Sequence, residues 1–309
     1  MENNNLSAIR PKLIAVATDL TDLDYLLPQA KAQASATGAT LWLVHVIPPQ
    51  VYVSPASGAY PFVPKEKALL DVERILAKKA EELQKEGFAC KYEIRRWFEA
   101  EQIAAFVREK KIDRLIIGSS GKSKLGKFLL GSVAEELIRT IDIPVCTIGP
   151  HVEPPKAPKA HEFLYAASLR HHAESSFEFA VEIAAVAKAT LTVLHVVEDT
   201  SAHSQQEFDA RIKIDYLLRR PALTVYGVNT VLRFGDPAKE ILREASQRRP
   251  EMLILGAVPA TAFTATIRTG VAYEVIKKAL CPVLTLRESL REISAASDTS
   301  QAVASHVGA

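Results

Sequence analysis

Two short apolar segments from the first half of the chain recur in the second half. Residues 43–47 (LVHVI) reappear as residues 193–197 (VLHVV), which lie 150 positions later. Residues 144–148 (PVCTI) reappear as residues 282–286 (PVLTL), which lie 138 positions later. The offset shrinks by 12 because the second half lacks most of the segment 48–64. In a chain of 309 residues, a repeat of this length predicts two copies of one domain.

Each copy alternates short apolar runs with longer amphipathic or alanine-rich stretches, which is typical of βαβ units. In the first copy we expect strands at 13–17, 40–47, 90–96, 114–117 and 144–148. We expect helices at 25–37, 65–86 and 101–110, a further helix after Gly131, and a loop at 48–64. The fold class is therefore α/β, with two tandem five-stranded parallel sheets that are doubly wound and Rossmann-like.

The closing strands of the two copies, at 144–148 and 282–286, should lie at the edges of their sheets. Because exposed edges tend to be covered or paired, we expect these two strands to pair with each other. Such a pair would relate the two copies by a pseudo-two-fold axis within one chain.

A glycine-rich loop follows the expected strand 114–117 and precedes a helix. It contains Gly118, Gly121, Gly131 and Ser132. Glycine lets the backbone approach a ligand closely, and the N–H groups at a helix start favour phosphate. Ser132 could cap the helix or give its hydroxyl to a phosphate oxygen. The loop is not a P-loop, because Ile116 stands where that motif needs glycine, and no G-x-G-x-x-G follows the first strand.

The spacing G-x2-G-x9-G-[ST] resembles the ATP-binding motif of the universal stress protein family. The resemblance covers nearly the whole chain as a tandem protein, and it implies an adenine nucleotide alpha hydrolase-like fold. It implies a flexible N-terminus at 1–11, an ATP-binding domain at 12–150, a linker at 151–160, a second domain at 161–287 and a flexible tail at 288–309.

The resemblance also implies roles for single residues. Asp19 would contact the ribose or adenosine side of ATP, Val46 would contact adenine through its main chain, and Gly118 would lie near the ribose. The phosphates would be bound by Gly121, Gly131, Ser132 and Val133. The residues alone leave three alternatives open: a helix cap for Asp19, core packing for Val46, and a glycine-rich turn without any ligand. A magnesium ion could accompany ATP, although the sequence offers no dedicated ligand.

The second copy departs from this pattern at three equivalent positions. Ser168 replaces Asp19, Pro259 replaces the second glycine, and Val271 follows Gly270 where the first copy has serine. Proline removes an N–H donor from the loop. We therefore expect a degenerate nucleotide site in the second copy, and one ATP per chain.

Composition narrows the class of partner. The net charge of +2 gives no reason to expect nucleic acid or an anionic membrane, and no apolar run is long enough to span a bilayer. The polar N-terminus lacks a signal peptide, and the three cysteines follow no zinc or redox spacing. These features favour a cytoplasmic protein.

The resemblance implies an ATP-binding stress-response protein, a nucleotide-dependent switch with little or no ATP turnover, and we identify no catalytic residue in the sequence. One alternative is a nucleotide-independent scaffold that presents a protein-binding surface. Another is a hydrolase or ligase of the related α/β superfamily, which would need a catalytic group that we do not find. The protein partner stays unknown, and the apolar segment 51–62 is one candidate surface for a homodimer.

Overall fold

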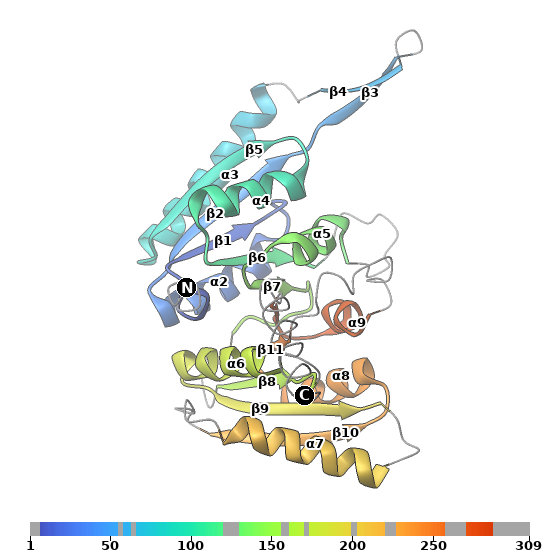
Figure 1. The fold of residues 1–309 in the computed structure, drawn as a ribbon. Helices are drawn as coiled ribbons and strands as arrows, with labels where there is room; N and C mark the ends of the chain where they lie inside the picture. Colours follow the sequence, from blue (N-terminus) through green and yellow to red (C-terminus); the bar gives the residue numbers. More distant parts are fainter. Residues whose placement is uncertain are drawn as a thin grey trace, which may run out of the picture.

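The computed structural model describes residues 7–54, 58–62, 66–119, 130–155, 161–169, 173–198, 203–219, 227–256 and 270–286. Within these residues a single ten-stranded sheet runs through both halves of the chain, in the order β10-β9-β8-β11-β12-β7-β6-β1-β2-β5. Figure 1 shows this sheet with helices along its length. The α/β class expected from the sequence is confirmed.

The first half supplies five strands of the sheet, all parallel to one another. They are β1 (Leu13–Ala17), β2 (Thr40–Ile47), β5 (Cys90–Arg96), β6 (Arg114–Gly118) and β7 (Val145–Ile148). The helices are α2 (Leu23–Thr37), α3 (Glu66–Lys85), α4 (Glu99–Lys110) and α5 (Ser132–Thr140). Gly38, in the left-handed region at φ 72°, ends α2 as a glycine C-cap does.

The second half repeats this order. Its strands are β8 (Glu162–Ala166), β9 (Thr190–Val197), β10 (Val228–Phe234), β11 (Met252–Leu255) and β12 (Val283–Thr285). Its helices are α6 (Ala173–Ala187), α7 (His203–Leu218), α8 (Pro237–Arg248) and α9 (Val271–Lys278). Strands β8 to β12 are parallel to one another, as in the first half.

The two halves join through their closing strands. β12 pairs with β7 in the antiparallel sense, with Leu284 opposite Cys146 and Val283 opposite Thr147. The hydroxyl of Thr285 also donates to the main-chain oxygen of Val145, at 3.1 Å. The predicted pairing of the closing strands is confirmed, and the edge that each half would expose on its own is covered by the other.

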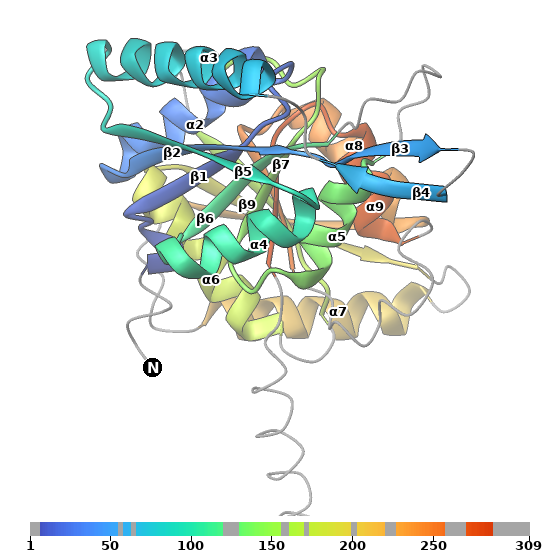
Figure 2. The same ribbon diagram turned by 90° about the horizontal axis from the view of Figure 1, so that it is seen from above.

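The helices cover both faces of the sheet, and each face has its own apolar core. One core lies under α2, α3, α6 and α7 and contains Leu76, Phe177 and Leu217. The other lies under α4, α5, α8 and α9 and contains Phe106 and Leu137. Figure 2, seen from above, shows helices on both sides of the twisted sheet.

The segment 48–64, which we expected to be a loop, contains a hairpin. β3 (Gln50–Ser54) pairs antiparallel with β4 (Gly58–Phe62), outside the main sheet. Figure 1 shows this hairpin projecting beyond the carboxyl end of β2. The two strands carry valine, tyrosine and phenylalanine, which favour extended backbone and which outweigh the prolines, glycine and serines of the same segment.

Candidate functional site

The phosphate-binding part of the predicted site lies at the start of α5. Gly131 is the N-cap, and no side chain caps the helix. Ser132, which we expected either to cap the helix or to meet a phosphate, is the first helical residue, and its side chain is exposed. The first N–H groups of a helix have no partner within it, so Ser132 and Val133 offer donors beside the positive end of the helix dipole.

The conformation of Gly131 does not require glycine. Its φ of −63° and ψ of 145° lie in the extended region, which every residue type can adopt. A glycine is therefore useful here for the space it leaves rather than for its backbone freedom.

A hydrogen bond closes the loop between β6 and α5. The N–H of Gly131 donates to the main-chain oxygen of Ser119 at 3.0 Å, and the N–H of Ser119 donates to Ile148 at 2.9 Å. The end of β6, with Gly118, is thus held next to the start of α5. Gly121 lies outside the described residues.

Asp19 follows β1 at the same edge of the sheet. Its Oδ1 accepts hydrogen bonds from the N–H and the hydroxyl of Thr21, at 2.8 and 2.6 Å. This is an Asx turn, and it differs from the helix cap that we considered, because the N-cap of α2 is Asp22. Asp19 is partly exposed, so its carboxylate can also meet a ligand.

The main chain of Val46 lies beyond the last residue pair between β1 and β2. That pair is Ala17 with Val44, and the N–H of Thr18 donates to Val44 at 3.0 Å. Alternate residues of a strand direct their backbone groups to the same neighbour, so Val46 directs its N–H and C=O past the end of β1. The Val46 side chain is buried in the core, and both core packing and a main-chain contact to a ligand are compatible with this position.

Sequence reasoning missed Asp22 and Tyr25, which lie beside Gly118. Asp22 is buried and accepts a hydrogen bond from the hydroxyl of Thr18. Burial, together with the nearby charge of Asp19, raises the pKa of the Asp22 carboxyl to about 6, although the Thr18 bond opposes this shift. Burial and the two aspartates also raise the pKa of the Tyr25 phenol. The only signal in the sequence was a second aspartate three residues after Asp19.

The charges divide the candidate site into two parts. Asp19 and Asp22 both lie between β1 and α2, and Asp22 packs beside Gly118 at the end of β6. Carboxylate oxygens can accept hydrogen bonds from hydroxyl groups but repel phosphate. The start of α5 offers N–H donors and the positive end of a helix, which favour an anion. A molecule with a polyol at one end and a phosphate at the other would match this division.

The second copy keeps the frame of this site but lacks the carboxylate of Asp19 and the hydroxyl of Ser132. Gly270 is the N-cap of α9 and has a similar extended conformation, with φ −77° and ψ 156°. The following residue is Val271, and an exposed Ser168 stands where the first copy has Asp19. Pro259 lies outside the described residues.

The two histidines of the repeated segment have a structural role. The Nδ1 atom of His45 lies 2.8 Å from the main-chain oxygen of Thr18, and that of His195 lies 2.8 Å from the oxygen of Ala167. Each imidazole thus ties the second strand of its half to the chain that leaves the first strand.

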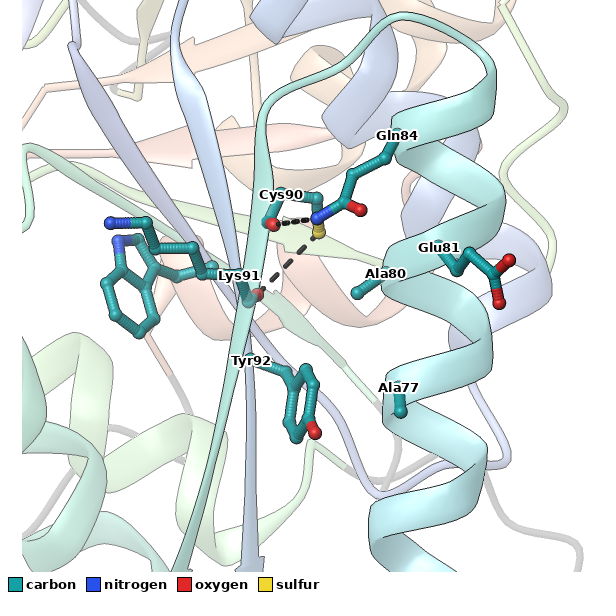
Figure 3. Close-up of a pocket in the computed structure, with 8 residues that line it drawn as sticks. Ala77, Ala80, Glu81, Gln84, Cys90, Lys91 and Tyr92 are labelled. Atoms are coloured by element: carbon teal, nitrogen blue, oxygen red, sulfur yellow. Dashed lines mark hydrogen bonds between the residues drawn. The ribbon is translucent and has the colours of Figure 1, made fainter.

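A hollow of about 390 Å³ lies elsewhere, beside the edge strand β5 (Figure 3). Ala77 and Gln84 of α3 face Cys90 and Tyr92 across it, and Gln84 donates to the main-chain oxygen of Cys90 at 2.8 Å. Burial raises the pKa of the Cys90 thiol to about 11, so this thiol is unreactive at neutral pH. The hollow shares no residue with the predicted nucleotide site.

Comparison with known families identifies both halves of the chain. The model of the universal stress protein family matches residues 11–148 and again residues 161–287. A universal stress protein of Methanocaldococcus jannaschii is 29% identical over 142 residues, which are 44% of this chain and 81% of that protein.

Two solved structures share the tandem arrangement. A universal stress protein from Archaeoglobus fulgidus matches with a TM-score of 0.67 and 18% identity, over 90% of this chain and 99% of the other. A putative universal stress protein from Pseudomonas aeruginosa matches with a TM-score of 0.59 and 18% identity, over 91% and 95%. At these identities the structures support the fold alone. Within the described residues, no helix is both long and apolar enough to cross a membrane.

Proposed function

The chain belongs to the universal stress protein family, and we propose that its first copy binds an adenine nucleotide, ATP in particular. Asp19 accepts hydrogen bonds from the ribose, and the main chain of Val46 contacts the adenine. Gly131, Ser132 and Val133 receive the phosphates at the start of α5. Gly118 and Gly121 complete the loop, as the motif implies.

One observation carries this proposal more than any other. Gly131 caps α5 in a conformation that any residue can adopt, no side chain caps the helix, and a hydrogen bond holds this helix start against the end of β6. A glycine that the backbone does not need leaves room for a ligand to approach the free N–H groups. The carboxylate of Asp19 is negative where the start of α5 is positive. This difference supports a nucleotide oriented with its ribose at β1 and its phosphates at α5.

We further propose that ATP acts as a ligand that switches the protein between states in a stress response. ATP stabilises the state that binds it, by about 2.7 kcal/mol at a hundredfold excess over its dissociation constant. Strand β2 ends at Ile47, one residue after Val46 and its proposed adenine contact, and the hairpin β3–β4 begins at Gln50. Nucleotide binding could therefore change the surface that the hairpin presents to a partner protein.

The test is isothermal titration calorimetry of ATP into the full chain and two matched variants. Gly131→Val places a branched side chain where the phosphates would approach, and we expect it to weaken ATP binding strongly. Gly270→Val makes the same change at the start of α9 and should leave ATP affinity unchanged. Equal ATP affinity in all three proteins would contradict the phosphate assignment.

If the wild-type chain binds no adenine nucleotide, the scaffold alternative replaces this proposal. Nucleotide analysis of protein purified without added ligand distinguishes the two, because a bound adenine nucleotide that survives purification is expected only for the nucleotide-binding protein.

A further inference from the structure

Helix α7 carries apolar side chains on two opposite faces. Its inner face packs on the sheet through Ala210, Ile214 and Leu217, which are all buried. Its outer face carries Phe208, Ile212 and Tyr216, which are 59%, 52% and 59% exposed. Because these three residues are spaced by four, they form one line along the helix, which we call the outer stripe. A helix that is apolar on both sides is typical of one that lies between two partners.

Among the described residues, the helix of the first half that corresponds to α7 carries no such stripe. On α3, the corresponding helix of the first half, the exposed apolar residues Leu70 and Ile75 are five positions apart and point in different directions. The exposed surface of α3 instead carries ion pairs such as Lys85 with Glu81. Figures 1 and 2 both place α7 at the periphery of the molecule, where another molecule can reach it.

We propose that the outer stripe is the contact surface of a homodimer, in which α7 packs antiparallel against α7 of a second copy of this chain. A two-fold axis at Ile212 places Phe208 of each chain at the height of Tyr216 of the other. The two isoleucines meet at the centre. Six large apolar side chains, three from each chain, then leave water together.

The charges beside the stripe favour this partner. Helical geometry places Asp209 and Lys213 along one flank of the stripe, and Arg211 and Asp215 along the other; all four residues are exposed. The two-fold axis places each flank beside the same flank of the second chain, which runs in the opposite direction. Along each flank the order becomes acid, base, base, acid, so that every aspartate lies about 3 Å along the axis from a base of the second copy.

The contacts that these four charged residues make within the chain leave them able to pair with a second copy. Asp209 accepts a hydrogen bond from Gln205 at 2.9 Å, and Arg211 pairs with Glu207 at 2.7 Å. Among the described residues, neither Lys213 nor Asp215 has an ion-pair partner. A contact through one helix pair is small, and interfaces below about 1,200 Å² in total are typical of weak or transient association. The dimer should therefore depend on protein concentration.

Sedimentation velocity of the full chain over a range of concentrations tests this proposal. We expect a monomer–dimer equilibrium that Ile212→Asp abolishes, because it buries a charge at the centre of the contact. Leu70→Asp is the matched control on α3 and should leave the equilibrium unchanged. Thermal unfolding by circular dichroism, recorded for each variant, verifies that it is folded. A wild-type chain that stays monomeric, or a dimer that survives Ile212→Asp, would overturn the proposal.

Exchanging the charges of Asp209 and Lys213 tests whether the two α7 helices pack antiparallel. This exchange leaves the apolar side chains of the outer stripe unchanged. Asp209→Lys and Lys213→Asp should each raise the dimer dissociation constant by about tenfold, through like charges at the contact. The double variant restores opposite charges along that flank and should return to near the wild-type value. A double variant as weak as the single ones would refute the antiparallel arrangement. All measurements are made without nucleotide, so their outcome does not depend on ATP binding.

Discussion

The carboxylate of Asp22 occupies the space that a side chain on Gly118 would need. A Cβ atom at Gly118 would lie 2.9 Å from Oδ2 of Asp22 and 3.0 Å from the phenol oxygen of Tyr25. The first turn of α2 therefore packs directly on the end of β6, and the glycine serves this packing as well as any ligand. At the equivalent Gly256 the nearest atoms lie at 3.6 Å, which is ordinary van der Waals distance.

This difference predicts unequal effects of alanine in the two halves. Gly118→Ala should destabilise the protein by about 1–3 kcal/mol, because Asp22 and Tyr25 must move to admit the methyl group. Gly256→Ala should change the free energy of unfolding by less than about 1 kcal/mol. Urea unfolding of both variants measures this, and equal losses would show that the first turn of α2 adapts freely.

Asp22 should make stability depend on pH. The pKa of its carboxyl is raised from 3.8 to about 6 in the folded protein, so the protonated form is the one that folding favours. The contribution of the protonated Asp22 carboxyl to the free energy of unfolding is complete below pH 4 and is lost as pH rises through 6. Its magnitude is up to about 3 kcal/mol. Asp22→Asn cannot ionise, so its stability relative to wild type should rise between pH 4 and pH 7. Urea unfolding at several pH values checks this, and a constant difference would contradict the raised pKa.

The shared sheet predicts that the two halves unfold together. The two tryptophans, Trp42 and Trp97, lie in the first half, so their fluorescence reports on that half alone. Leu284 is fully buried on β12, opposite Cys146 of β7. Leu284→Ala should cost about 2–5 kcal/mol and should lower the midpoint of the tryptophan transition, although the change is in the second half. A circular dichroism transition that moves while the fluorescence transition does not would mean that the halves unfold separately.

Much of this fold could be predicted because buried parallel strands leave a strong pattern. The runs at 13–17, 40–47 and 90–96 match β1, β2 and β5 residue for residue. The pairing of β7 with β12 followed from the edge position of two repeated segments. Helix ends were less accurate, since α2 starts at Leu23 and not at residue 25. The hairpin β3–β4 was missed because prolines, glycine and serines suggest a loop.

Side-chain contacts between helices and strands could not be predicted, because they leave no local pattern in the sequence. In the first half the guanidinium of Arg95 lies 5.2 Å from the ring centre of Phe106, which also packs against Trp42. Arg95 also pairs with Glu93 and Glu109. In the second half Arg233 occupies the position of Arg95 and donates to the buried carboxylate of Glu244 at 2.6 Å. The Asp22–Gly118 contact is of the same kind, because it depends on how α2 packs on β6.

The candidate site predicts one ATP per chain. In the first copy Ser132 follows Gly131 and Asp19 follows β1, whereas in the second copy Val271 follows Gly270 and Ser168 stands at the position of Asp19. The second copy therefore lacks the carboxylate and the serine that we propose for ribose and phosphate, and Pro259 removes an N–H donor from its loop. Calorimetry should give a stoichiometry near one, and a value near two would mean that the second copy binds nucleotide without these groups.

ATP turnover should be slow or absent. Fast phosphoryl transfer needs positioned charge and an oriented nucleophile, such as a metal held by carboxylates, a cationic finger or a base beside the attacking water. The described residues around the start of α5 offer N–H donors and the exposed hydroxyl of Ser132, groups that would hold ground-state phosphate without assisting its transfer, whereas Ser119 is buried. Uniform binding of this kind does not raise the rate of the chemical step. Phosphate release from the purified chain should therefore stay well below about 1 per second, the lower end of the ordinary enzyme range. Gly131→Val is the control: faster release that this variant abolishes would reveal an ATPase with a catalytic group outside the residues considered above.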